Sequence, residues 1–159
     1  MDESNINGCI NRNGCINRNV YSSMLFIIPT LYAYVLLPYY SELMVGSLLC
    51  LITSVYHHYY KAEIVFFKTL DRIVVNSIGF FFTLRCIIKI GNKFYANIMY
   101  FFGILAWATF YYVSVYNSKL YCDYHCLVHI FAVIGILFCI KAHETYLLPQ
   151  DKENLSNIT

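Results

Sequence analysis

The stretch SVYHHYYKAEIVFFKTLD, from Ser54 to Asp71, joins two apolar runs of this 159-residue chain and carries much of its candidate chemistry. An apolar run that begins at Leu43 ends here at two adjacent histidines, and a short charged link then leads to a carboxylate. Ser54 and His58 are four residues apart, so on a helix they share one face. Ionisable side chains at the end of a membrane-length apolar run are costly and usually mark a functional site.

The composition of the whole chain is typical of an integral membrane protein. Hydrophobic residues make up 59% of it and charged residues 13%, against about 45–50% and about 25% in an ordinary soluble domain. The net charge of +2 is too small to favour a nucleic-acid partner. The seven cysteines show no zinc-finger spacing. Those within apolar runs, Cys50, Cys86, Cys126 and Cys139, are most simply small buried apolar residues.

Apolar runs predict an all-α fold, a polytopic transmembrane bundle of about five spans. The runs cover about Val20–Tyr40, Leu43–Tyr60, Leu70–Ile88, Phe94–Tyr116 and Tyr124–Ile140. A spanning helix takes about 20 mainly apolar residues. The first and fourth runs meet this easily, whereas the others are short or polar at one end. We expect a disordered polar tail at 1–19 with a repeated NGCINR, a transmembrane domain at 20–142, and an unstructured polar tail at 143–159.

The connectivity of five spans places the candidate site residues in one layer. If the second run ends at one membrane face, the third leaves that face near Asp71, the fourth returns to it, and the fifth leaves it near His125. His58, Asp71, His125 and His129 then lie near the same face. The side that holds the N-terminus and the candidate site has six lysines and arginines, and the other side has five. Because cytoplasmic loops carry more of these residues, this margin of one favours a cytoplasmic N-terminus and site.

The histidines have the spacing of zinc ligands. His125 and His129 are four residues apart, so both imidazoles can point at one ion on a helix. His58 can supply a third nitrogen, and three protein ligands leave a coordination position for water, as in catalytic zinc sites. Asp71 can orient that water or accept its proton. Ser54 can hydrogen-bond the water, a neighbouring ligand or a reacting carbonyl.

Simpler interpretations of the polar residues stay open. Paired histidines in a tyrosine-rich helix are more often interfacial or hydrogen-bonded than metal-bound. Asp71 can form an ion pair with Arg72 at a helix start, and Ser54 can donate to the carbonyl of Cys50.

Other residues can also replace those chosen. His57 can be the ligand in place of His58, and Asp123 can take the role of Asp71 because it lies two residues before His125. His143, after the last run, is interpreted as a solvated residue.

In order and placement, these residues resemble the CREST superfamily, which includes alkaline ceramidases, progestin and adipoQ receptors, haemolysin-III-like proteins and GPI-lipid remodelling proteins. The matching segments are SVYHH at Ser54–His58, LD at Leu70–Asp71 and HCLVH at His125–His129. The resemblance implies Zn²⁺ bound by the three histidines, with Ser54 and Asp71 completing the site, and hydrolysis of an amide or ester bond in a membrane lipid. The family usually has seven spans, so this chain would be a reduced member with a smaller or rebuilt lipid cavity.

Three functions of other classes stay open beside a ceramidase-like hydrolase. One is a haem-binding bundle in which paired histidines ligate iron. Another is a membrane receptor or assembly factor that keeps zinc for structure only. The third is a structural membrane protein without a metal.

Overall fold

The computed structural model describes residues 17–36, 41–59, 65–88, 93–113 and 121–156, and these residues form helices and turns without a strand. A helical segment at 17–24 comes first. It is followed by α2 (Ile27–Leu36), α3 (Ser41–Tyr59), α4 (Val65–Ile88), α5 (Lys93–Tyr111) and α6 (Tyr121–Ser156). The prediction of an all-α fold is confirmed. Most of the predicted N-terminal tail, including the NGCINR repeat, lies outside the described residues, and its last three residues are helical.

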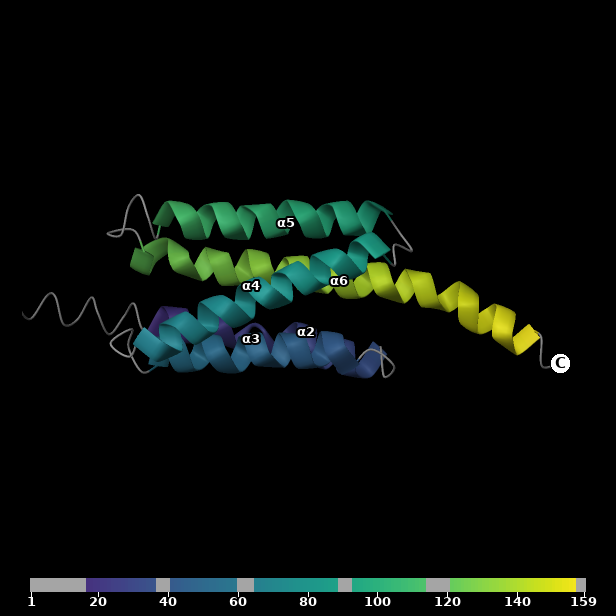
Figure 1. Ribbon diagram of the computed structural model, residues 1–159, viewed down its shortest axis with the longest axis horizontal. Helices are drawn as coiled ribbons and strands as arrows, with labels where there is room; N and C mark the ends of the chain where they lie inside the picture. Colours follow the sequence, from purple (N-terminus) through teal and green to yellow (C-terminus); the bar gives the residue numbers. More distant parts are fainter. Residues whose placement is uncertain (1–16, 37–40, 60–64, 89–92, 114–120, 157–159) are drawn as a thin grey trace, which may run out of the picture.

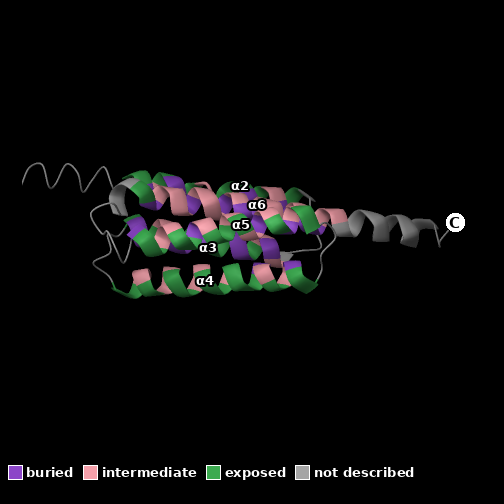
Figure 2. Cartoon of the chain, turned by 90° about the horizontal axis from the view of Figure 1, so that it is seen from above, coloured by how far each residue is buried: buried purple, intermediate pink, exposed green. Residues whose placement is uncertain are grey.

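The helices form an elongated bundle in which α5 and α6 lie side by side (Figure 1). On the other side of the bundle α3 packs against α2 and α4. α4 crosses diagonally from the C-terminal end of α3 to the N-terminal end of α5, and both α2 and α4 contact α6. Figure 2 shows that most of α4 is exposed or half-buried; its buried residues are Phe82 and Cys86.

The start of α3 and the end of α4 approach each other closely. An added Cβ at Gly46 of α3 would lie 3.1 Å from a ring carbon of Phe82 on α4. Glu42 and Arg85 form an ion pair between the same two helices. Phe82 belongs to the buried core, together with Phe26, Leu43, Met99, Ile136 and Ile140.

The first apolar run is interrupted, so the single helix predicted over Val20–Tyr40 is wrong. Pro29 has no N–H with which to continue the helix to the carbonyl of Leu25. Ile28 donates to that carbonyl instead, at 3.0 Å, within a turn at residues 25–26. Pro29 then lies in the first turn of α2, where proline is tolerated. The resulting α2 has 10 residues, too few to cross a bilayer alone.

Two described helices are long and apolar enough to cross a membrane: α5, and the part of α6 from Tyr124 to Thr145. The prediction of membrane-spanning helices is therefore supported for two of the five predicted runs. The charged residues Lys68, Asp71, Arg72 and Arg85 make α4 less apolar than either.

α6 continues far beyond the end of the fifth apolar run, through Ser156, where the sequence predicted an unstructured tail. His143 is 0% exposed, so its interpretation as a solvated residue is wrong. It lies four residues after Cys139, so both side chains share one face of the helix. Lys141 and Glu144 form a 2.9 Å ion pair in the same turn, which helps the helix to continue.

Candidate metal centre

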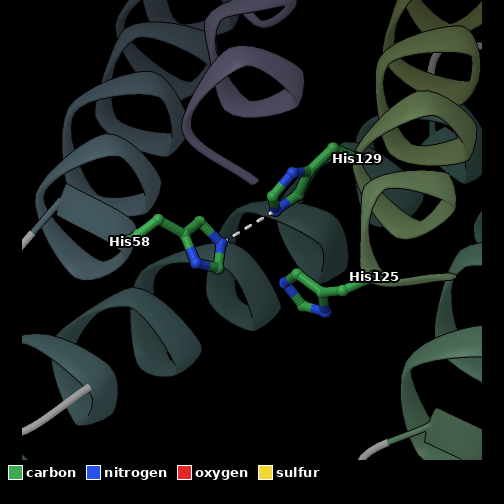
Figure 3. Close-up of side chains that lie close together, drawn as sticks. All are labelled: His58, His125 and His129. Atoms are coloured by element: carbon green, nitrogen blue, oxygen red, sulfur yellow. Dashed lines mark hydrogen bonds between the residues drawn. The ribbon is translucent and has the colours of Figure 1, made fainter. Parts of the chain in front are cut away.

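Three buried histidines from two helices face one another (Figure 3). His58 lies near the end of α3, and His125 and His129 lie near the start of α6. Each offers a ring nitrogen within 4.8 Å of the other two. The Nε2 atoms of His58 and His129 are 3.3 Å apart. With Zn–N bonds of about 2.0–2.1 Å, neighbouring ligands of a tetrahedral zinc lie about 3.3–3.4 Å apart, so the cluster fits one ion.

The helical segment at 17–24 determines which nitrogen of His129 carries the proton. The hydroxyls of Ser22 and Ser23 both donate to the carbonyl of Asn19, at 3.0 and 2.8 Å. Because the Ser22 proton is used there, its oxygen accepts a hydrogen bond from Nδ1 of His129, at 2.7 Å. Nε2 of His129 then keeps its lone pair and faces His58. Metal-ligating histidines usually have such a partner on the other ring nitrogen.

Sequence reasoning missed Ser22. The residue lies 107 positions before His129 and outside every segment that resembles a known family. Its only signal was a pair of serines near the start of an apolar run, and such serines often bond to the backbone of their own helix. Only the packing of residues 17–24 against α6 reveals the contact.

Asp71 on α4 is held by two hydroxyls of α3. Ser54 donates to its Oδ1 atom at 2.6 Å, and Thr53 donates to the same oxygen at 3.2 Å. Ser54 therefore positions the carboxylate, a contact that the sequence did not specify. Donation from Ser54 to Cys50, the simpler interpretation, is not the contact found. Thr53 was missed because Ser54, the next residue, has the four-residue spacing to His58 and was chosen instead.

A cavity of about 570 Å³ joins this polar centre to an apolar space between α4, α5 and α6. Its polar part is lined by Ser54, Asp71, Arg72, His125 and His129. Most of the remaining lining is apolar, with Val75, Met99 and Trp107 as examples. An apolar pocket with a few convergent polar groups is the usual form of a small-molecule site.

The structure also separates the alternatives that the sequence left open. His57 is buried with its ring centroid 4.6 Å from that of His58, but His58 is the one within reach of a shared ion. Arg72 lies over the ring of Phe110 at 5.5 Å, and among the described side chains no ion pair joins it to Asp71. The side chain of Asp123 lies outside the described residues.

Comparisons of this chain with family models, with curated proteins and with solved structures found no match. The resemblance to the CREST superfamily thus stays an expectation that rests on three short segments.

Proposed function

We propose that the protein is a multi-pass membrane hydrolase, a reduced relative of the CREST superfamily that cleaves an amide or ester bond in a lipid. His58, His125 and His129 would hold zinc. The observation that carries this proposal is the buried three-histidine cluster, whose 3.3 Å Nε2–Nε2 separation equals the edge of a tetrahedral zinc site. The adjoining carboxylate and apolar cavity supply the other parts that such a reaction needs.

Each residue of the centre has a separate task in this proposal. Zinc held by the three histidines would supply a Lewis acid and would activate water as a nucleophile. Asp71 accepts a proton during the reaction and returns it to the leaving group. Ser54 and Thr53 hold one carboxylate oxygen of Asp71, and the other oxygen would accept the proton. The apolar walls of the cavity bind the hydrocarbon chain and exclude water.

Exposed apolar side chains support a membrane location beyond the two candidate spans. On α4, Phe80 is 65% exposed, and on α5 Ile104 and Trp107 are 66% and 63% exposed. Such side chains on one monomer are typical of a surface that faces lipid. They favour a bundle in which α4 is also embedded, with the centre near one membrane face.

The histidine geometry argues against haem. Two axial histidines must lie on opposite sides of a porphyrin, whereas the Nε2 atoms of His58 and His129 are 3.3 Å apart. The ring would not fit between them. A colourless purified protein is the expected result.

The first experiment tests the metal site. Protein purified in detergent without chelators is expected to contain zinc, and His58→Ala is expected to lose one equivalent of it. His57→Ala is the matched control, because His57 is adjacent and equally buried but outside the cluster. A wild type without a stoichiometric transition metal, or loss of zinc only in the His57 variant, would contradict the assignment.

The second experiment separates catalysis from metal binding. Asp71→Asn keeps the shape of the side chain and a hydrogen bond from Ser54 but cannot accept a proton. Because three histidines suffice to hold zinc, the variant should keep its metal. Its turnover of a ceramide-like or ester lipid should fall about 10²–10⁴-fold, which is about 3–5 kcal/mol of barrier.

Two results would redirect the proposal. If the Asp71→Asn variant hydrolyses lipid at the wild-type rate, Asp71 is not the proton acceptor. If the wild type holds zinc but hydrolyses neither class of lipid, the metal is structural and the protein is a receptor or assembly factor.

A further inference from the structure

A second group of metal-binding side chains lies at the opposite end of the bundle. Cys86 near the end of α4, with Cys139 and His143 of α6, has ligand atoms that all lie within 4.8 Å of one another. All three residues are 0% exposed. At about 1.5 Å of rise per residue, His129 and His143 are about 21 Å apart along α6, so this group is separate from the three histidines.

We propose that Cys86, Cys139 and His143 form a second zinc site, which fastens α4 to α6. The Sγ atoms of the two cysteines are 3.4 Å apart. This is far longer than a disulfide bond of about 2.05 Å, and both cysteines are free. In a tetrahedral site with Zn–S bonds of about 2.3 Å, two sulfur ligands lie about 3.8 Å apart. A shift of a few tenths of an ångström brings the pair to that distance.

The backbone contact of His143 fixes which of its ring nitrogens carries the proton. Its Nδ1 atom lies 2.9 Å from the carbonyl oxygen of Cys139. A carbonyl only accepts, so Nδ1 carries the proton and donates, and the other nitrogen, Nε2, keeps its lone pair. A backbone carbonyl is a usual partner for the non-ligating nitrogen of a zinc-bound histidine. Cys139 and His143 also share the four-residue spacing of His125 and His129 on the same helix.

Charge favours zinc over copper(I). Two thiolates and a neutral imidazole give the ligands a charge of −2, which Zn²⁺ neutralises. A copper(I) ion, which also binds soft sulfur ligands, would leave a net negative charge in a fully buried place, at a large cost. Cys139 also borders the cavity between α4, α5 and α6.

The position of the cluster gives the proposed site its structural role. α4 carries Asp71 but is mostly exposed or half-buried, and Cys86 is one of its two buried residues. α6 carries His125 and His129. A metal bond between Cys86 and α6 therefore fixes the helix of the carboxylate against the helix of the histidines. The proposal does not depend on lipid hydrolysis.

Cobalt substitution tests this site without relying on activity. In full-length protein stripped of zinc and loaded with Co²⁺, a thiolate-to-cobalt charge-transfer absorption is expected, because among the described residues this is the candidate metal cluster with sulfur ligands. His58→Ala should keep the absorption. Cys86→Ser, Cys139→Ser and His143→Asn should each weaken or abolish it and lose one equivalent of zinc. Cys126→Ser is the matched cysteine control and should change neither.

The cobalt measurement on the wild type is decisive even if a variant fails to fold. Absence of the charge-transfer absorption in wild-type protein, or its persistence in both cysteine variants, would overturn the proposal. So would a Cys86–Cys139 disulfide found by mass spectrometry in protein purified under reducing conditions, because the pair would then be a redox couple. Loss of lipid hydrolysis in His58→Ala with the absorption intact would concern only the first centre.

Discussion

His129 is held in place by a hydroxyl relay that begins at a backbone carbonyl. The proton of Ser22 goes to Asn19, so the serine oxygen can only accept from Nδ1 of His129. The relay fixes the tautomer in which Nε2 of His129 can bind a metal ion. Ser23 makes the same bond to Asn19 but lies 3.4 Å from Nδ1, against 2.7 Å for Ser22. The two neighbouring serines thus differ in their distance to Nδ1 of His129, and an experiment can use this difference.

We expect Ser22→Ala to weaken zinc binding at the histidine centre by about 10–100-fold, the usual effect of removing a partner of a ligating histidine. Ser23→Ala should have a clearly smaller effect, since its contact with Nδ1 is long. Competitive titration against a zinc-binding dye measures both. Equal losses in the two variants would mean that the contact with Asn19, rather than the bond to Nδ1, matters.

At the residue scale the sequence predicted some contacts and missed others. The four-residue spacing of His125 and His129 needs only a helix, and the parity of the runs correctly brought His58 to the same end of the bundle. Ser22 and His143 depend on how two helices rotate against each other, which no local pattern contains. For this reason His143 was expected in solvent and is fully buried.

At the scale of elements, the packing of α3 against α4 brings Ser54 to Asp71. This packing depends on Gly46, a small residue of α3. An added Cβ at Gly46 would lie 3.1 Å from Cζ of Phe82 and 3.4 Å from a methyl of Ile78. Phe82 is 3% exposed, so its ring has little room to move. Gly79 on α4 has nothing within 4 Å of an added Cβ.

We expect Gly79→Ala to raise the thermal midpoint in detergent and Gly46→Ala to lower it. Alanine in place of glycine within a helix gains about 0.5–1 kcal/mol. At Gly46, overpacking costs about 1–3 kcal/mol and outweighs that gain. Circular dichroism during heating compares the two. A rise of similar size in both variants would show that α3 and α4 separate easily at this crossing.

The boundaries of elements were predicted less well than their existence. Runs two to five each became a helix, but the first run was read as continuous although Pro29 lies in it. Proline removes a single donor, and a hydropathy pattern does not register that loss. The end of α6 was misplaced for the opposite reason, since the chain stays helical after Ile140, where Ala142 and His143 are buried.

At the scale of the whole molecule, the histidine centre and the cluster of Cys86, Cys139 and His143 lie at opposite ends of α4 and at two levels of α6. The histidine centre lies near the start of α4 and of α6, and the cysteine cluster lies near the end of α4 and further along α6. Phe80 on α4 and Ile104 and Trp107 on α5 are exposed and form an apolar band between these levels. If that band faces lipid, the two centres lie near opposite membrane faces.

This arrangement predicts the sidedness of four exposed positions. Cysteines placed at Tyr59 and Tyr124 mark the histidine end, and cysteines at Ile88 and Phe94 mark the other end. All four residues are exposed. The background replaces Cys9, Cys15, Cys122 and Cys126 by serine and keeps the buried cysteines.

With a membrane-impermeant maleimide on sealed vesicles, the Tyr59 and Tyr124 variants should be labelled from one side and the Ile88 and Phe94 variants from the other. Inverted vesicles expose the cytoplasmic membrane face to the reagent. If the histidine centre is cytoplasmic, the Tyr59 and Tyr124 variants should therefore react in inverted vesicles. Labelling of both pairs from the same side would mean that α4 and α5 do not cross the bilayer. Labelling of Tyr59 and Tyr124 from opposite sides would show that the number of spans between them is odd, and the proposed membrane arrangement of the histidine centre would be wrong.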